Sequence, residues 1–406
     1  MDTGDTAWLL MSTALVMIML PGLALFYGGL VRSKNVLSTI MHSFFGLALV
    51  SVVWVVVGFT LAFGPDVNGL GLIGGLDFAM FNGVGLTPSP QYATTVPFVL
   101  FAAFQLMFAA ITPALITGAF AERKRFGAFV LFTILWSILV YSPLAHWVWS
   151  TDGWLYKLGA LDFAGGTVVH ISSGVSALIV ALLIGRRTTN GEPMTPHDVP
   201  MTVLGAGMLW FGWFGFNAGS AVTAGGLAAS AFIVTNTSAA AATISWVLAS
   251  YLHKGKVSVI GAACGAVAGL VAITPASGFV GAGGALVIGL VAGGLCYSAT
   301  LLRERIKVDD ALDVFAVHGV GGMFGAVATG VFATAAVQPA FTGLLEGNGL
   351  QLVHQIVAVG ATIGYAVVAT FGIIKVVDLI LGIRVNSADE ALGLDLSVHG
   401  EVAYQV

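Results

Sequence analysis

Long apolar runs separated by short polar segments dominate the chain. An α-helix needs about 20 apolar residues to cross a bilayer, and the sequence contains eleven runs of that order. They cover approximately residues 7–31, 38–63, 96–121, 126–148, 163–185, 199–220, 226–251, 257–274, 279–302, 311–334 and 351–383. The runs are continuous and do not alternate in ten-residue segments, so they exclude a transmembrane β-barrel. The pattern predicts an all-α polytopic membrane protein with eleven transmembrane helices.

Basic residues lie almost entirely on one side of these predicted spans. Of the 15 Lys and Arg residues, 13 follow an odd-numbered span: Arg32, Lys34, Arg123, Lys124, Arg125, Arg186, Arg187, Lys254, Lys256, Arg303, Arg305, Lys307 and Arg384. Basic loops favour the cytoplasmic side of a membrane. We therefore expect the N-terminus outside the cell and the C-terminus inside it, with residues 1–384 as one transmembrane domain and 385–406 as a polar cytoplasmic tail.

Composition supports the membrane assignment and excludes other classes. Hydrophobic residues make up 58% of the 406 residues and charged residues only 8%, against roughly 25% charged in an average soluble domain. The 54 glycines suit helices that approach closely within a bilayer. A net charge of −4 gives no reason to expect nucleic acid as a partner. The motifs of zinc proteases, P-loop enzymes and serine hydrolases are absent, so we expect no enzyme, no cofactor and no bound metal.

Two short motifs place an Asp and then a His at the start of an apolar run. They are Asp162-Phe-Ala-Gly-Gly-Thr-Val-Val-His170 and Asp313-Val-Phe-Ala-Val-His318. If spans 1–5 and 6–10 are repeats, their odd number of helices makes the second copy inverted, and such repeats place the transported species near the midplane between them. We therefore predict an inverted 5+5 repeat, about residues 7–185 and 199–334, plus one extra helix at 351–383.

Three residues of these motifs each allow two interpretations. Asp162 is either a helix N-cap, which we favour because Asp so often begins helices, or a cation ligand. His170 and His318 are either buried imidazoles bonded to a carbonyl or residues that line a pathway. We favour the pathway, because ionisable residues in membrane spans usually face the bundle interior.

Aromatic residues share helix faces with a hydroxyl. Trp213, Phe216 and Ser220 lie on one face of the sixth span, and Phe104 and Phe108 lie on one face of the third. Trp149, at the outer end of the fourth span, is either an interfacial belt residue or part of a cation–π site. For the phenylalanines the alternative is contact with lipid.

Together these motifs resemble those of the ammonium transporter (Amt/Mep/Rh) family, specifically its bacterial Amt branch. The resemblance covers essentially the whole chain. Besides the two Asp–His motifs it is carried by Phe104-Gln-Leu-Met-Phe108-Ala-Ala-Ile-Thr, Trp213-Phe-Gly-Phe216-Asn-Ala-Gly-Ser220, Phe120-Ala-Glu-Arg123 and His399-Gly-Glu-Val-Ala-Tyr404. It implies a homotrimer in the cell (inner) membrane, with one pore per subunit and a tail that PII signal proteins engage.

The resemblance also implies roles for single residues. An outer site that recruits ammonium is implied for Trp149, Phe108 and Ser220. A gate below that site is implied for Phe108 and Phe216. The residues implied to line the pore are His170, His318, Trp213 and Phe104, while Asp162 and Asp313 would shape the structure around the sites.

The function expected from this resemblance is transport of ammonium or ammonia. Ammonium would be recruited by cation–π contact, lose a proton, and pass as ammonia through an apolar pore, with or without separate proton movement. One alternative is an ammonium sensor that signals through its tail. Another is a membrane redox protein that uses histidines in or near the spans as haem ligands, among His42, His146, His170, His318 and His354.

Overall fold

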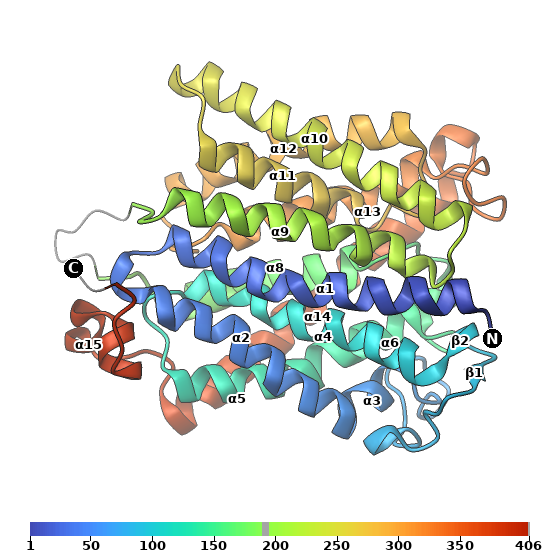
Figure 1. Ribbon diagram of the computed structural model, residues 1–406, viewed down its shortest axis with the longest axis horizontal. Coiled ribbons are helices and arrows are strands. Elements are labelled where there is room, and N and C mark those ends of the chain that lie inside the picture. The colour runs from blue at the N-terminus through green and yellow to red at the C-terminus, as the bar shows by residue number, and fades with distance from the viewer. Residues whose placement is uncertain (189–194, 405–406) are drawn as a thin grey trace.

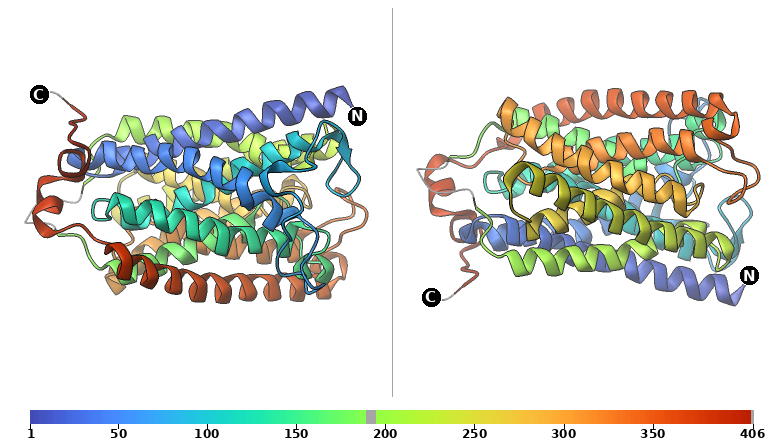
Figure 2. Two further views of the ribbon diagram at one scale, coloured as in Figure 1. Left: turned by 90° about the horizontal axis from the view of Figure 1, so that it is seen from below. Right: turned by 90° about the horizontal axis from the view of Figure 1, so that it is seen from above.

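The helices of the bundle run roughly along its long axis, and the two termini lie at opposite ends (Figure 1). This computed structural model describes residues 1–188 and 195–404. Both further views keep the N-terminus at one end and the C-terminus at the other (Figure 2). We refer to them as the N-terminal end and the C-terminal end of the bundle.

Fifteen α-helices occur in the described chain. They are α1 (Thr3–Leu30), α2 (Val36–Val53), α3 (Phe59–Phe63), α4 (Phe98–Phe120), α5 (Phe126–Trp136), α6 (Ser142–Trp149), α7 (Trp154–Leu158), α8 (Ser172–Ile184), α9 (Val199–Ala218), α10 (Gly226–Lys254), α11 (Val259–Ile273), α12 (Ala282–Ile306), α13 (Gly321–Phe332), α14 (Gly349–Leu381) and α15 (Ser387–Leu392). A two-stranded antiparallel sheet at the N-terminal end joins β1 (Pro88–Ser89) to β2 (Ala93–Pro97).

Short π-helical and 3₁₀ segments interrupt or extend these helices. The π-helical segments are η2 (Trp54–Gly58), η4 (Ser137–Tyr141), η5 (Gly166–Ile171), η7 (Phe315–Val320) and η9 (Asp395–His399). The 3₁₀ segments are η1 (Ser33–Asn35), η3 (Ala79–Phe81), η6 (Gly219–Ala221) and η8 (Leu344–Glu346). Both motif histidines lie in π-helical segments, which are frequent at functional sites.

The prediction of an all-α polytopic membrane protein is confirmed. Ten helical segments of the described chain are long and apolar enough to cross a membrane. The eighth predicted span, 257–274, contains α11, whose 15 residues fall short of the ~20 that a spanning helix needs. The Ser258 hydroxyl accepts from the Gly261 amide where α11 begins, and the helix ends shortly before Pro275. The eleventh span and the orientation of the termini stay predictions.

The two helices that follow the histidine motifs run in opposite directions. A side-chain carbon on Gly174 would lie 2.1 Å from the Gly319 nitrogen, and one on Gly322 would lie 3.1 Å from the Gly166 oxygen. Residue numbers therefore increase along one helix in the direction in which they decrease along the other. The two helices are antiparallel, as an inverted repeat requires. Because Gly174 has no side chain, the two backbones touch directly at this crossing.

Asp162 caps the start of η5 as predicted. Its carboxylate accepts from the amides of Gly165 (2.8 Å), Gly166 (2.6 Å), Thr167 (2.7 Å) and Val168 (3.4 Å), and from the Thr167 hydroxyl. These amides have no partner within the helix, and the positive end of the helix favours a carboxylate. The Asp162 carboxylate therefore acts as a cap at the start of this helix.

The counterpart of Asp162 in the second half is Asp310, and the expectation that it is Asp313 was wrong. Asp310 accepts from the Phe315 amide at 2.7 Å and precedes its histidine by the same eight residues (318 − 310, against 170 − 162). Asp313 instead adopts a left-handed backbone (φ 58°), and its carboxylate lies 2.6 Å from Arg303 Nε.

The tail packs against the C-terminal end of the bundle. Asp395 accepts from the amides of Leu37 (3.0 Å) and Ser38 (2.8 Å), so a residue of the tail caps α2. The Leu394 amide donates to Asn35 Oδ1 at 2.8 Å. Residues 405–406 of the predicted tail lie outside the described residues.

The helix crossing at Gly174 predicts a sharp steric effect. Gly174→Ala would force a methyl group into the Gly319 backbone, and overpacking of this kind typically costs ~1–3 kcal/mol. We expect the thermal unfolding midpoint of the detergent-solubilised protein to fall. Gly360→Ala in α14 is the matched control, because nothing lies within 4 Å of its added carbon. An equal loss of stability in both variants would contradict the crossing.

The cap predicts that Asp162→Asn lowers the stability of the protein, although Asn and Asp are similar in size. The amide NH₂ of Asn cannot accept, so buried backbone amides are left without a partner at ~1–3 kcal/mol each. We expect a lower unfolding midpoint, measured by the same method. Asp77→Asn, on an exposed carboxylate of the loop after α3, is the control. Stability equal to that of the parent would show that the cap matters little.

Candidate functional site

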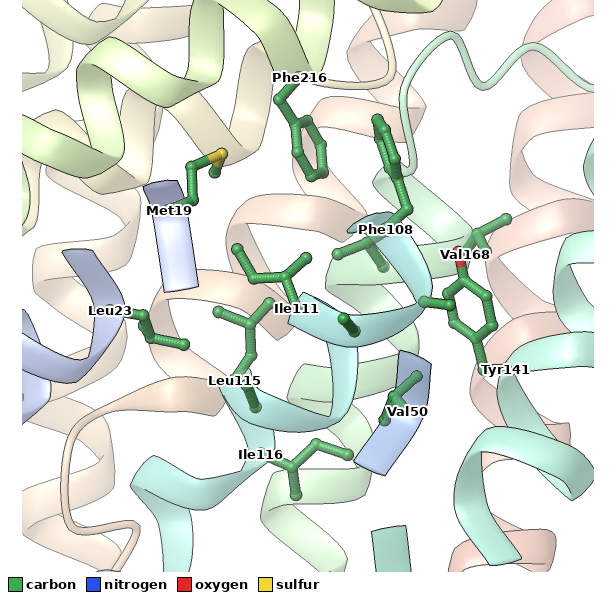
Figure 3. Close-up of a cluster of buried hydrophobic side chains, with 14 of the residues drawn as sticks. Met19, Leu23, Val50, Phe108, Ile111, Leu115, Ile116, Tyr141, Val168 and Phe216 are labelled. Carbon is green, nitrogen blue, oxygen red and sulfur yellow. The ribbon is translucent and has the colours of Figure 1, made fainter. Parts of the chain in front are cut away.

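Four aromatic rings form a column through the middle of the bundle. The Phe108 and Phe216 ring centroids lie 4.2 Å apart, Phe216 and His170 6.0 Å, and His170 and His318 5.3 Å, each pair within about 31° of parallel. Figure 3 shows Phe108 and Phe216 side by side above the aliphatic side chains of Ile111 and Leu115. The rings come from α4, α9, η5 and η7, so both halves of the chain build the column.

The two histidines contact each other through their Nδ1 atoms. The Nδ1–Nδ1 distance is 3.2 Å, and the side chains are almost completely buried, with 1% of His170 and 4% of His318 exposed. In such a hydrogen bond one nitrogen donates and the other accepts. The two Nδ1 atoms therefore share one proton, and the apolar surroundings of the rings disfavour a net charge on the pair. His170 Nε2 is buried and has no hydrogen-bond partner among the described residues.

A narrow apolar cavity, which we call the histidine cavity, surrounds this contact. Its walls come from both halves of the chain and are mostly aliphatic or aromatic: Met19, Leu23, Phe26, Ile111, Leu115, Val169, His170, Leu209, Trp213, Phe216, Val267 and His318. The indole N–H of Trp213 donates to Thr274 Oγ1 at 2.9 Å, so it is already used. The imidazole nitrogens are therefore the polar groups that this cavity offers to a guest.

A wider recess opens on the other side of Phe108, toward the N-terminal end. It has a volume of about 200 Å³, and we call it the N-terminal recess; it is lined by Phe63, Gln91, Tyr92, Phe101, Gln105, Phe108, Trp149, Thr151, Tyr156, Phe163, Ser220 and Val222. Trp149 meets Phe108 edge to face, with centroids 5.8 Å apart at 89°. Aromatic faces of this kind attract cations.

Two oxygen atoms in the N-terminal recess are acceptors. The Ser220 hydroxyl donates to the Phe216 carbonyl at 2.8 Å, so its proton is occupied while its lone pairs stay available. Gln105 Oε1 is buried and has no partner among the described residues. Gln105 was missed from the sequence, although it lies on the same helix face as Phe108, three residues away.

The remaining predicted residues take supporting positions. Phe104 packs against the ring of Phe108, 5.0 Å away, and is not among the residues that line these two cavities, so its place in the pore stays a prediction. The Asp162 carbonyl accepts from Trp149 Nε1 at 3.0 Å, which fixes the indole in the wall of the recess. Asp313 lines a separate hollow at the C-terminal end with Leu30 and Cys264.

The geometry argues against the haem alternative for the central histidines. Two axial ligands must leave space for iron between them, and each imidazole nitrogen stands ~2 Å from a metal. The 3.2 Å between the Nδ1 atoms of His170 and His318 is too short for this. Among the residues the structure describes, no group of three or more His, Cys, Asp or Glu side chains could hold a metal ion.

The fold and sequence closely match known ammonium transporters. The chain is 52% identical to an ammonium transporter of Bacillus subtilis, across 100% of this chain and 99% of the relative. It is 49% identical to ammonium transporter Amt1 of Archaeoglobus fulgidus, across the full length of both.

Solved structures agree with these relatives. The structure of Saccharomyces cerevisiae Mep2 superposes with a TM-score of 0.89 at 38% identity, covering 96% of this chain and 88% of that one. A structure described as a sensor Amt protein also superposes with a TM-score of 0.89, at 31% identity, covering 97% and 98%. The model of the Ammonium Transporter Family matches residues 7–404, and the chain therefore belongs to the ammonium transporter family.

Proposed function

We propose that ammonium binds in the N-terminal recess, loses a proton there, and crosses the histidine cavity as ammonia. The protein is a multi-pass ammonium transporter of the cell membrane. The mechanism rests on one observation, the column of rings that leads from Trp149 and Phe108 at the recess to His318 in the cavity. In this proposal the N-terminal end faces the outside of the cell.

Recruitment at the recess combines two attractions. A cation between Trp149 and Phe108 gains cation–π energy, worth about 2 kcal/mol or more where water is excluded. The Ser220 oxygen, whose own proton is bound to a carbonyl, accepts a hydrogen bond from ammonium. The Gln105 oxygen supplies a second acceptor. Potassium would feel the same ring faces, so this site alone discriminates poorly between the two cations.

Selectivity arises at the next step, because the histidine cavity rejects charge. Phe108 and Phe216, 4.2 Å apart, separate the recess from the cavity and must rotate to let a molecule pass. A charged group in an apolar membrane interior costs at least ~2.5–3.5 kcal/mol. Ammonium escapes this penalty by releasing a proton, which potassium cannot do.

The paired imidazoles supply the hydrogen bonds that ammonia loses with its water shell. The free Nε2 of His170 faces the cavity as either a donor or an acceptor, according to the tautomer. Since the two Nδ1 atoms share one proton, a change of tautomer on one ring requires a change on the other. The pair can thus stay neutral while it offers ammonia either a hydrogen-bond donor or an acceptor. The two rings also offer a separate route for the released proton.

We further propose a homotrimer that a PII protein contacts at the C-terminal end. Basic residues gather there, and the tail is docked on the start of α2 through Asp395. The same docking favours the alternative of an ammonium sensor, because a tail attached to a transport helix can report its movement. An electrical recording on reconstituted protein under an ammonium gradient, with potassium as control, distinguishes transport from sensing with little conduction.

Removal of the recess groups should weaken recruitment. We expect Trp149→Leu to raise the apparent KM for uptake roughly tenfold, which corresponds to about 1.4 kcal/mol, and Ser220→Ala to raise it less. Initial rates of labelled methylammonium uptake into proteoliposomes measure both. Phe371→Leu, which removes an exposed ring of α14, is the control. Kinetics like those of the parent in both recess variants would contradict the assignment.

A fixed charge in the histidine cavity should alter selectivity or rate. His170→Asp places a carboxylate where the walls offer little compensation, so we expect ammonium uptake to fall at least about tenfold or potassium current to appear. His170→Asn keeps the site neutral and polar, and should retain more uptake with no potassium current. Rate and selectivity equal to those of the parent in the Asp variant would show that His170 does not line the pathway.

A further inference from the structure

Another buried histidine, His146, joins two parts of the chain beside the N-terminal recess. His146 lies in α6 and is completely buried. Its Nδ1 is 3.0 Å from the Ala62 carbonyl oxygen, and its Nε2 is 3.1 Å from Asp66 Oδ1. Both partners belong to the end of α3 and the loop that follows it, so the imidazole bridges α6 and this loop.

The hydrogen bonds define the protonation state of the ring. A carbonyl and a carboxylate can only accept, whereas a neutral imidazole has a single N–H to donate. Ala62 lies in the last turn of α3, where carbonyls lack helical partners and the helix end favours a cation. Only the imidazolium form satisfies both neighbours.

Asp66 is the matching anion. Burial alone would raise its pKa, but hydrogen bonds from the Gly71 amide and the His146 ring outweigh burial and hold the pKa below its ordinary value. The other charged groups near this end of α6 are Asp152 and Lys157, which are exposed and pair with each other at 3.9 Å. In the described chain, Asp66 is the charged group in contact with His146.

This ion pair connects two walls of the N-terminal recess. Phe63, which lines the recess, directly follows Ala62, and Trp149 comes three residues after His146. The same loop is fastened again at its tip, because the Trp147 indole donates to the Leu72 carbonyl at 2.8 Å. The position of α6 relative to α3 therefore depends on the loop and on the pair at its base.

We propose that the Asp66–His146 pair is a positioning device that sets the aromatic wall of the recess and makes ammonium recruitment depend on external pH. While His146 is an imidazolium, both hydrogen bonds form and Phe63 and Trp149 are held in place. Loss of the proton leaves a lone pair facing an acceptor, which pushes α6 and the loop apart. The inference rests on the proposed function, because it takes the recess as the recruitment site.

The test compares pH profiles of the apparent KM for methylammonium in proteoliposomes, from about pH 5 to about pH 9. An aliphatic amine stays protonated over this range, and histidine titrates within it. In the parent we expect the apparent KM to rise roughly tenfold toward alkaline pH, with little change in the maximal rate. A structural role without titration would leave this profile flat.

Two variants address the pair directly. In Asp66→Asn, the amide can donate to or accept from Nε2, so the neutral ring is satisfied as well and the apparent KM should no longer rise toward alkaline pH. In His146→Gln the side chain does not titrate, and the profile should become flat. His253→Gln is the matched control, because His253 lies on α10 at the C-terminal end and bonds to the Tyr297 hydroxyl at 2.8 Å.

The outcomes separate this inference from the proposed function. Profiles of Asp66→Asn and His146→Gln that superimpose on the parent profile would overturn the positioning device, even if Trp149→Leu still raised the KM. An unaltered KM in Trp149→Leu would instead overturn the recess as the recruitment site. Nitrogen NMR of the His146 ring gives a reading independent of uptake. A ring whose protonation does not change between about pH 5 and about pH 9 would also overturn the inference.

Discussion

The hydrogen bond between His170 and His318 requires that only one of the two Nδ1 atoms carries a proton, and much of the fold serves to make that bond possible. It requires two helices from different halves of the chain to run antiparallel and to approach until their backbones touch, as they do at Gly174 and Gly319. It also requires an apolar surround, since water would protonate or separate the rings. The same dry, apolar cavity therefore keeps the histidine pair neutral and excludes ions.

The carboxylates around this centre act on the backbone and leave the cavity free of charge. Asp162 and Asp310 hold the first amides of η5 and η7, which fixes where each histidine helix begins. Asp162 also orients Trp149 through its carbonyl, so one residue aligns both the recess and the helix behind it. A carboxylate inside the cavity would hold a cation too firmly to release it. At the helix starts, the same charge stabilises the structure without binding the substrate.

The sequence was sufficient for the features that the bilayer imposes. Apolar runs of spanning length predicted ten of the helical segments, and helical spacing placed Phe216 and Ser220 on one face. The misses all depend on packing that periodicity does not encode. Asp313 was expected to be the counterpart of Asp162, but its own left-handed backbone redirects the chain before η7, and spacing along the sequence cannot show this. Gln105 was not predicted, because the burial of its oxygen without a partner among the described residues depends on the fold.

The π-helical turns that carry His170 and His318 bear on the history of the chain. Such a turn holds one more residue than an α-helical turn, so each half contains what amounts to a one-residue insertion at the corresponding place, η5 and η7. If the predicted inverted repeat arose by duplication of one ancestral half, a wide turn already present in that half explains both. The histidine site would then be older than the duplication, and the first pore would have been assembled from two identical copies facing opposite ways.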